Sequence, residues 1–376
     1  MPAFRPSPAA LRSLRRCYST SPATPPTSPF APRHLLSIAD LTPAELTTLV
    51  QNAHKHKTAI KQTNEVPHSM RAALAGKTVA MTFSKRSTRT RISTEGAIAA
   101  FGGSPMFWPR TTYSWVYDSH SIHLLLLLHT DARGTGQRVP LRHLPSPLQH
   151  DCCHCCPRRT PLGRCRPRKT LKRACHQCPL RPLPPLQIIA DLLTICEIYP
   201  SASSTSLGLE GLKIAWIGDA NNVLFDLAIG ATKLGIDIAV ATPAGYEIPE
   251  AMRQVISHAA QTSPRAGKLI ETTSPEEACK NADILVTDTW VSMGQEEETA
   301  KRLKAFAGFQ ITSELAKRGG AKDNWSFMHC LPRHPEEVAD EVFYGPRSVV
   351  FNEAENRLWS AISVMEAFVV NKGKIQ

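Results

Sequence analysis

Hydrophobic residues recur along this chain in two patterns. Leu46, Leu49, Val50 and Ala53 are spaced as on one face of a helix, and the preceding Thr-Pro-Ala-Glu segment, 42–45, has the residues that begin one. Short apolar runs typical of buried strands alternate with further segments of helical period. The predicted strands span 77–83, 213–217, 236–241 and 282–288. Of the predicted helices, one begins near 42, one ends at 101, one spans 186–198, one ends at 234 and one spans 353–370.

Strands that alternate with helices favour parallel α/β sheets. The chain has 376 residues, a length that predicts two domains. We therefore expect an α/β protein with two domains, each containing a parallel sheet flanked by helices. The longest purely apolar runs, among them 124–128, are far shorter than the ~20 residues that a membrane helix needs, so we expect no membrane span.

The formal net charge of +12 comes from two segments. Residues 1–33 carry +5 without a single acid, residues 111–187 carry +9, and the rest of the chain is slightly acidic, at −2. Segment 1–33 is rich in Arg, Ser and Pro, which is typical of a mitochondrial transit peptide; the alternative is a disordered basic tail. We exclude it from the fold, expect a location in the mitochondrial matrix, and expect neither nucleic acid nor a membrane as partner.

Residues 111–184 differ from the segments that flank them. They contain seven of the eleven cysteines, no Glu and no sustained period of helix or strand. We interpret them as a stretch translated in the wrong frame, or from a misjoined exon, and expect them to be disordered or misfolded. A zinc site is one alternative, but four cysteines crowd into 152–156, where adjacent side chains diverge. An RNA-binding arm is another, but the basic stretch 158–173 lacks aromatic residues. We expect no metal and no cofactor.

A cluster of hydroxyl and basic residues, Ser87-Thr88-Arg89-Thr90, stands where the first predicted strand gives way to a helix. A helix N-terminus presents unpaired N–H groups and a partial positive charge. The hydroxyls add donors, and an Arg guanidinium is a planar fork suited to phosphate. The alternative is a capped helix with a solvated basic turn. The pattern predicts an anion site.

The stretch FSKRSTRTRISTEGA, which contains this cluster, resembles the carbamoyl-phosphate signature of the aspartate and ornithine carbamoyltransferase family, whose core reads S-T-R-T-R. Later motifs resemble the ornithine branch of that family. They are GDANNV at 218–223, DTWVSMGQ at 288–295, HCLPR at 329–333 and EAENR at 353–357. The resemblance covers roughly 34–110 and 186–376.

The resemblance implies transfer of a carbamoyl group from carbamoyl phosphate to the side-chain amine of ornithine, which gives citrulline and phosphate. Asp288 would supply an anion for the ammonium, Cys330 would orient the reacting groups, and Arg357 would face the carbamoyl group as a fixed cation; these three are the predicted catalytic residues. Taken singly, Cys330 could instead be an inert buried thiol, and Asp288 a helix cap or ion-pair partner. The implied carbamoyl-phosphate contacts are Ser87, Thr88, Arg89, Thr90, Gln187, Cys330, Leu331 and Arg357, and the implied ornithine contacts are Asn222, Asp288, Ser292 and Met293.

The resemblance also implies how the chain is divided. Residues 34–185 would form the carbamoyl-phosphate domain, with the C-terminal helix 353–376 packed back on it, and 186–352 the ornithine domain. The family forms homotrimers in which a neighbouring subunit completes the phosphate site. One position departs from the family: Pro184 stands where the family has a His that contacts the carbonyl oxygen.

Proline at position 184 can neither donate a hydrogen bond nor carry a charge. A phosphate-contacting Arg of the family also has no recognisable counterpart in 111–187. We therefore expect this chain to have reduced activity. The alternatives are a catalytically impaired pseudoenzyme that binds amino acids, and an aspartate-type carbamoyltransferase.

Overall fold

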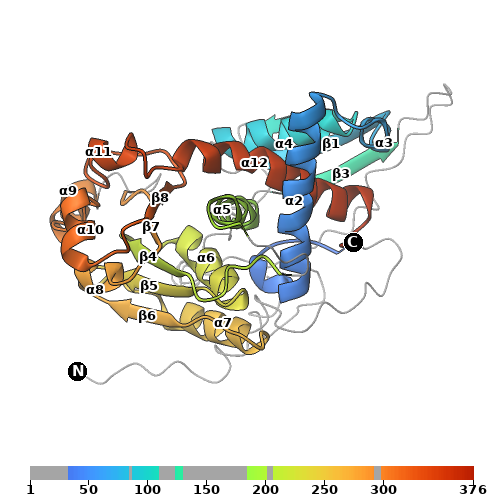
Figure 1. Cartoon of the computed structure of the whole chain (residues 1–376). Helices are drawn as coiled ribbons and strands as arrows, with labels where there is room; N and C mark the ends of the chain where they lie inside the picture. The colour runs from blue at the N-terminus through green and yellow to red at the C-terminus, as the bar shows by residue number, and fades with distance from the viewer. Residues whose placement is uncertain (1–32, 84–86, 110–122, 130–183, 201–205, 292–297) are drawn as a thin grey trace, which may run out of the picture.

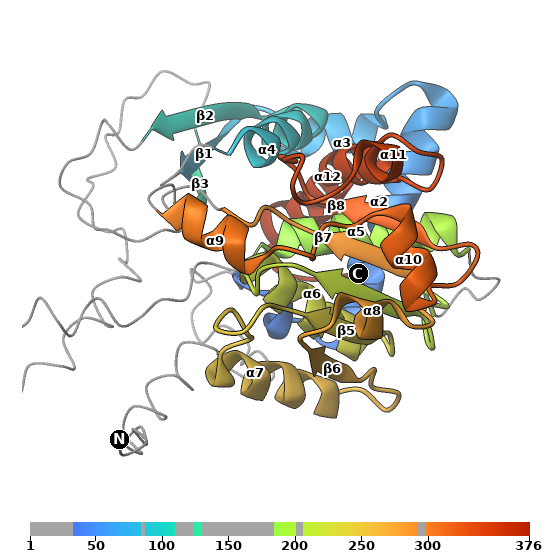
Figure 2. The same cartoon turned by 90° about the vertical axis from the view of Figure 1, so that its left-hand side faces the viewer.

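A computed structural model describes residues 33–83, 87–109, 123–129, 184–200, 206–291 and 298–376 (Figure 1). These residues form two sheets with helices packed around them. Figure 2 shows the smaller sheet at the top and the larger one, from β8 down to β6, beneath it. Two helices, α5 (Pro185–Ile198) and α12 (Val350–Val364), lie in the region between the sheets.

The N-terminal part begins with the short 3-10 helix η1 (Ile38–Asp40), followed by α2 (Pro43–Thr63) and α3 (His68–Ala73). The predicted start of α2 is confirmed. The Thr42 side chain accepts a hydrogen bond from the Glu45 backbone N–H, and the Glu45 side chain accepts one from the Thr42 backbone N–H. This reciprocal pair satisfies donors that a helix N-terminus otherwise leaves unpaired.

The smaller sheet has the strand order β2-β1-β3, with bounds β1 Lys77–Phe83, β2 Ser104–Pro109 and β3 His123–His129. Between β1 and β2 the chain forms α4 (Thr88–Ala100), and this β1-α4-β2 unit is parallel, as predicted. Strand β3, however, pairs antiparallel with β1, so this sheet is mixed. An antiparallel neighbour satisfies the edge of β1 that would otherwise keep unpaired N–H and C=O groups.

Strand β3 lies within the atypical segment 111–184, so an ordered strand interrupts that segment. The hydrophobic pattern did not predict this strand, because a run of five leucines has the period of neither a strand nor a helix. Apart from β3 and Pro184, residues 111–184 lie outside the described part of the chain.

The larger sheet is parallel throughout, as predicted, with the order β6-β5-β4-β7-β8. Its strands are β4 Lys213–Ile217, β5 Asp237–Ala241, β6 Leu269–Thr272, β7 Ile284–Thr287 and β8 Ser326–His329. The chain proceeds from β4 outward to β6 and then returns to place β7 on the other side of β4. The loops after β4 and β7 therefore diverge at a topological switch point, which is where open α/β sheets bind ligands.

Helices cover both faces of this sheet. Successive residues of β4 point to opposite sides: Ile214 and Trp216 join one apolar cluster, and Ala215 and Ile217 join the other. The first cluster includes α6 (Asn222–Lys233) and α7 (Glu250–Gln261). The helices of the other cluster are α8 (Pro275–Cys279), α9 (Thr299–Ala305), α10 (Ser313–Gly319) and α11 (Asp340–Phe343).

Helix α12 connects the two sheets. It begins three residues earlier than the predicted start at 353 and continues as a π-helix, η8 (Met365–Val370). It packs against α2, α4 and α5. Ser363 donates its hydroxyl hydrogen to the Leu49 carbonyl at 2.7 Å. The helix that carries the EAENR motif therefore reaches from the end of β8 to the beginning of α4.

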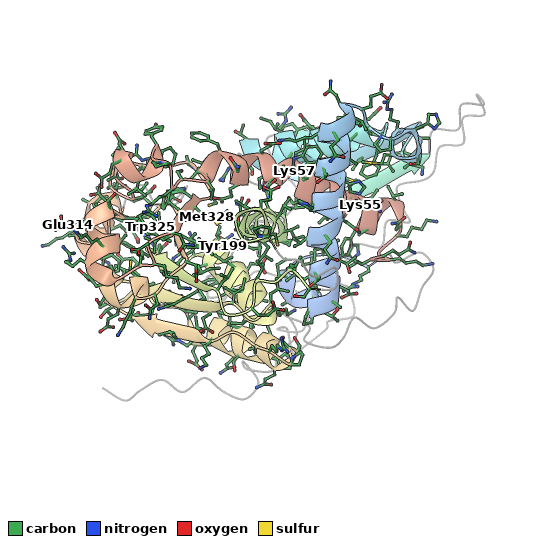
Figure 3. All side chains as sticks on the ribbon, viewed as in Figure 1. Lys55, Lys57, Tyr199, Glu314, Trp325 and Met328 are labelled. Atoms are coloured by element: carbon green, nitrogen blue, oxygen red, sulfur yellow. The ribbon has the colours of Figure 1, made fainter. Side chains whose placement is uncertain are left out.

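A buried polar network holds α2, α5 and α12 together. Lys57 of α2 lies beside α12 (Figure 3), with its Nζ 2.8 Å from Asn356 Oδ1 and 2.5 Å from a carboxylate oxygen of Glu197. Asn356 in turn donates to Thr194 Oγ1 at 2.9 Å. Because the partners satisfy one another, their hydrogen bonds offset the desolvation of the polar side chains through which the three helices meet.

Candidate functional site

Strand β1 leads into the N-terminus of α4, where the predicted anion cluster lies. Ser87 occupies the N-cap position and its side chain makes no capping hydrogen bond to the helix. Thr88 is exposed, and Ser87, Arg89 and Thr90 are half-buried. The start of α4 therefore presents its backbone donors together with hydroxyl groups that the cap does not use.

Two arginines from distant parts of the sequence meet at this cluster. The Arg89 guanidinium donates to the Leu331 carbonyl oxygen, and Arg357 of α12 donates from Nη2 to Thr90 Oγ1 at 3.0 Å. The Nε and Nη1 atoms of Arg357 are buried without a hydrogen-bond partner. Burial, and then the neighbouring Arg89, lower the pKa of Arg357 to about 10. Unpaired N–H groups of a buried cation suit the oxygen atoms of an anionic ligand.

The loop after β8 supplies a thiol that donates to a carboxylate. Cys330 Sγ lies 2.9 Å from Asp288 Oδ1, and Asn221 Nδ2 donates to Asp288 Oδ2 at 2.7 Å. Burial, reinforced by Asp288, raises the pKa of the Cys330 thiol well above its ordinary value. The thiol therefore stays protonated at neutral pH, which suits a donor that orients a carboxylate and does not suit a nucleophile.

Helix α6 begins directly at this carboxylate. Asn221 is its N-cap, because Oδ1 accepts hydrogen bonds from the Val223 and Leu224 backbone N–H groups at 2.9 and 3.2 Å. The same side chain donates to Asp288 through its nitrogen, so one amide fixes both the helix start and the carboxylate. Asn222, the predicted ornithine contact, is the first residue of α6.

A second buried network holds the loop that follows Asp288. Glu337 accepts hydrogen bonds from the Trp290 backbone N–H at 3.1 Å and from His329 Nε2 at 3.2 Å. Burial would raise the pKa of Glu337, but hydrogen bonds from His329 and His334 hold it below its ordinary value. Because His329 Nδ1 accepts the Leu331 N–H at 2.9 Å, its proton lies on Nε2.

On the opposite side of the same loop, Arg302 of α9 donates to the Trp290 carbonyl at 2.7 Å and forms an ion pair of 3.1 Å with Asp219. Asp219 belongs to the loop after β4. The loops after β4 and β7 are therefore tied together at Asp219 and Trp290 through a buried guanidinium.

The amide of Gln187 faces two carboxyl groups. Its Nε2 donates to Asp191 Oδ1 at 2.7 Å and to Glu353 Oε1 at 3.0 Å. Pro184 directly precedes this helix in its N-cap position and provides no side-chain cap. Gln187 is thus held by α12 at the same end of α5 where the family's His would stand.

Comparison with known proteins identifies the family. Residues 33–121 match the family described as aspartate/ornithine carbamoyltransferase, carbamoyl-P binding domain, and residues 210–368 match its Asp/Orn binding domain. The chain belongs to the aspartate/ornithine carbamoyltransferase family. Residues 122–209 lie in neither match, and most of the atypical segment 111–184 falls among them.

The individual relatives that the chain resembles are named ornithine carbamoyltransferases, and two of the three described next are named mitochondrial. A protein of Aspergillus niger named mitochondrial ornithine carbamoyltransferase is 56% identical over 98% of this chain and 95% of its own length. The crystal structure of a mitochondrial ornithine carbamoyltransferase from Coccidioides immitis matches with a TM-score of 0.70 and 48% identity, over 92% of this chain and all of that one. The ornithine carbamoyltransferase from Pyrococcus furiosus matches with a TM-score of 0.64 and 32% identity, over 89% of this chain and 96% of its own.

The structure brings most of the predicted carbamoyltransferase residues together and leaves others outside its description. Ser292 and Met293 lie in the segment 292–297, which is not described. The remaining predicted residues gather where α4, α5, α6, α12 and the loops after β7 and β8 meet; they are Ser87, Thr88, Arg89, Thr90, Gln187, Asn222, Asp288, Cys330, Leu331 and Arg357.

Several supporting residues were missed by sequence reasoning. Asn221 had a usable signal, because Asn before a helix is a favoured N-cap. Asp191 was visible only as an acid inside an apolar helical segment, where an unpaired charge would be costly, and Glu353 was visible only as part of the EAENR motif, without a role. Glu337 and Arg302 gave no local signal, since their partners lie far away in the sequence.

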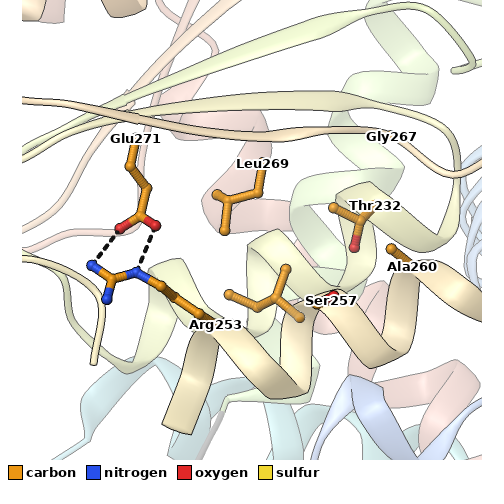
Figure 4. Close-up of a pocket in the computed structure, with 8 residues that line it drawn as sticks. Thr232, Arg253, Ser257, Ala260, Gly267, Leu269 and Glu271 are labelled. Carbon is orange, nitrogen blue, oxygen red and sulfur yellow. Dashed lines mark hydrogen bonds and ion pairs between the residues drawn. The ribbon is translucent and has the colours of Figure 1, made fainter. Parts of the chain in front are cut away.

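The other candidate sites are weaker. A surface cavity of about 320 Å³ between α7 and β6 contains none of the predicted residues. Its Arg253 already forms a bidentate ion pair with Glu271, at 2.7 and 3.0 Å (Figure 4). Among the described residues, no group of three or more His, Cys, Asp or Glu could hold a metal, and the cysteines of 152–178 lie outside them. None of the helices in the described part of the chain is long and apolar enough to cross a membrane.

Proposed function

We propose that this chain is an ornithine carbamoyltransferase of arginine biosynthesis in the mitochondrial matrix. It transfers the carbamoyl group of carbamoyl phosphate to the side-chain amine of ornithine and releases citrulline and phosphate. The observation that carries the proposal is the meeting of Arg89 and Arg357 with the Cys330–Asp288 pair. A cationic pocket for a phosphate thus adjoins a buried anion for an ammonium group.

On the carbamoyl-phosphate side, the α4 N-terminus and its hydroxyls bind the phosphate. Ser87, Thr88, Arg89 and Thr90 supply these donors. Arg357 donates its free N–H groups to the carbamoyl oxygen and the bridging oxygen, where negative charge develops during the transfer. A cation fixed by burial stabilises that charge without having to reorganise, so it lowers the barrier rather than merely tightening binding.

On the ornithine side, Asn222, Asp288, Ser292 and Met293 bind the amino-acid end of the substrate, and Asp288 supplies the anion for its ammonium group. The protonated Cys330 holds one oxygen of Asp288, and Asn221 holds the other. The side-chain amine attacks once it has lost its proton, and a neutral amine is nucleophilic enough that no acyl-enzyme forms. Holding both substrates in line supplies most of the remaining rate enhancement.

We further propose the division and assembly that the family implies. Residues 34–185 together with 353–376 form the carbamoyl-phosphate side, and 186–352 form the ornithine side. Three copies form a homotrimer in which a neighbouring subunit completes the phosphate site. The proposed partners are therefore carbamoyl phosphate, ornithine and two further copies of the chain.

Pro184 lowers the rate of carbamoyl transfer that we expect. The family's His at this position donates to the carbonyl oxygen, and proline removes that donor. Loss of one donor to a developing oxyanion lowers kcat by about 10²–10³. We expect the chain to bind both substrates and to turn over slowly.

A competition between amino acids tests the proposal. The purified chain is supplied with carbamoyl phosphate and either L-ornithine or L-aspartate, and the carbamoylated products are quantified. Citrulline formation that saturates with ornithine supports the proposal. Carbamoyl-aspartate as the main product indicates the aspartate-type alternative, and ornithine binding with no product from either amino acid indicates the pseudoenzyme.

A further inference from the structure

Two buried carboxyl groups beside the site have no part in the transfer described above. Asp191 of α5 is 3% exposed and Glu353 of α12 is 2% exposed. Both accept a hydrogen bond from the Gln187 amide nitrogen, at 2.7 and 3.0 Å, so the two carboxyl groups lie side by side. Two buried carboxylates in this position would repel each other, and a proton shared between them removes that repulsion.

The Gln187 amide is bound to both members of this pair. An amide nitrogen has two N–H donors, and Gln187 uses them on Asp191 Oδ1 and Glu353 Oε1. The acceptors thereby fix which end of the amide is nitrogen. The carbonyl oxygen of Gln187 therefore remains available to a ligand, and it can only accept a hydrogen bond.

Glu353 also contacts the loop that carries Cys330. Its second carboxyl oxygen, Oε2, accepts the backbone N–H of His329 at 2.9 Å, at the end of β8. Arg357 lies one turn further along α12 and faces the pair, as does Arg89 from α4. Glu353 therefore links α5, α12 and the Cys330 loop at one buried point.

Electrostatics favour a single negative charge on the pair. Burial raises the pKa of Asp191 to about 7, and burial together with Asp191 raises that of Glu353 well above its ordinary value. The cations Arg89 and Arg357 face the pair from α4 and α12, while the neighbouring Cys330 is a neutral thiol. A second buried charge in contact with the first would have to overcome both desolvation and repulsion.

We propose that Asp191 and Glu353 are positioning residues that share one proton, and that this singly charged pair orients Gln187 to accept an N–H of the carbamoyl group. The inference deepens the proposed function and rests on it. It also predicts a specificity: acetyl phosphate, which has a methyl group in place of the amide nitrogen, cannot donate to Gln187. The same pair positions the Cys330 loop through the His329 N–H.

Replacing Glu353 in two ways separates orientation from charge. Glu353→Gln keeps one of the two acceptor oxygens and supplies an N–H donor in place of the O–H of the protonated carboxyl, whereas Glu353→Met keeps the length and removes both oxygens. With Glu353→Gln we expect the KM for carbamoyl phosphate at neutral pH to stay within about three-fold of the parent. With Glu353→Met we expect that KM to rise ten-fold or more, with a smaller change in the KM for ornithine. Glu355→Gln, an exposed position on the same helix, is the control.

The pH profile gives a second readout. In the unsubstituted chain, rising pH removes the shared proton, and the KM for carbamoyl phosphate should increase. The Glu353→Gln variant cannot lose that proton and should lack this increase. If Glu353→Gln is as damaging as Glu353→Met, or if Glu353→Met equals the parent, the proposal is wrong.

Infrared difference spectroscopy tests the proton itself and does not require activity. The spectrum of the unsubstituted chain minus that of Glu353→Gln at neutral pH should show the carbonyl stretch of one protonated carboxyl, and the corresponding difference with Glu355→Gln should not. A difference spectrum that contains only ionised carboxylate overturns the shared proton. If the chain forms no citrulline, the proposed function fails, and the infrared result still decides this inference.

Discussion

The two sheets of this molecule differ in how completely they build their share of the site. The five-stranded sheet is parallel throughout, and its loops after β4, β7 and β8 carry Asn221, Asp288 and Cys330, which bind one another directly. The described part of the smaller sheet is mixed and contributes only the start of α4. Its cluster is completed by Arg357 and Leu331 from elsewhere in the chain.

The difference shows that the two substrates are recognised by different structural means. The ornithine side is built from loops of three neighbouring strands, β4, β7 and β8, at a switch point, where the topology itself brings the residues together. The carbamoyl-phosphate side depends on α12. This helix extends from the larger sheet and brings the Arg357 cation and the buried Glu353 carboxyl group to the site. Changes in α12 should therefore damage carbamoyl-phosphate chemistry more than ornithine binding.

The largest effect is expected from Arg357→Met, which keeps the length of the side chain and removes its charge. Because the lost N–H groups face the developing negative charge, kcat should fall by about 10³ or more, while the KM for ornithine changes little. Steady-state kinetics with each substrate varied in turn measure both quantities. An equal loss of ornithine affinity would contradict the separation of the two sides.

Pro184→His is expected to act in the opposite direction. The residue stands at the N-cap of α5 with a φ of −99°, which is open to histidine. Restoring a donor to the carbonyl oxygen should raise kcat by about 10²-fold. The same assay measures it, with Pro184→Ala as the control that removes the proline ring without adding a donor. A gain that Pro184→Ala reproduces would assign the effect to backbone freedom instead.

A smaller effect on the ornithine side is expected from Asn221→Ala. The substitution removes both a helix cap and the donor to Asp288, so the free energy of unfolding should fall by about 1 kcal/mol and the KM for ornithine should rise by about ten-fold. Denaturant unfolding and kinetics measure the two effects.

Thr312→Ala is the matched control for Asn221→Ala, because Thr312 caps α10 through the Leu315 N–H at 3.0 Å and contacts no site residue named above. It should cost the same stability without changing the KM. If both variants raise the KM for ornithine equally, Asn221 acts through stability alone.

A separate prediction, which concerns stability and not catalysis, is the pH dependence of stability. Burial raises the pKa of Asp226 to about 7, whereas an unfolded Asp titrates near about 3.9. Between those values the folded state binds more protons than the unfolded one, so rising pH should reduce stability by up to about 1.4 kcal/mol per pH unit.

Asp226→Asn does not titrate and tests this dependence. The stability of the parent minus that of the variant should fall from about pH 4 to pH 7 and be constant above pH 7. Urea unfolding at each pH provides the measurement. A difference that does not vary with pH would show that Asp226 is ionised throughout.

The fold was predictable wherever local signals agreed. The Thr42 cap, the strand Lys77–Phe83 and the helix after Pro184 follow directly from residue pattern, and the structure confirms them. Strand β2 was not predicted, because proline near both ends hides its pattern. The antiparallel direction of β3 depends on a pairing with β1 that no local signal encodes.

The site was predictable only where residues belong to compact motifs. Arg89, Asp288 and Cys330 stand in recognisable stretches of sequence. Asp191 does not, and Glu353 lies in the EAENR motif but its pairing with Asp191 arises only when α5 and α12 meet. Long-range partners of this kind cannot be read from the spacing of residues along the chain.

Citrulline formation by the purified chain, measured against the concentration of both substrates and compared with Pro184→His, tests the central claim most directly. We predict slow formation that saturates with carbamoyl phosphate and with ornithine, and that accelerates in the Pro184→His variant. Absence of citrulline from both proteins, with both folded, would contradict the claim that Arg89, Arg357, Asp288 and Cys330 form a carbamoyl-transfer site.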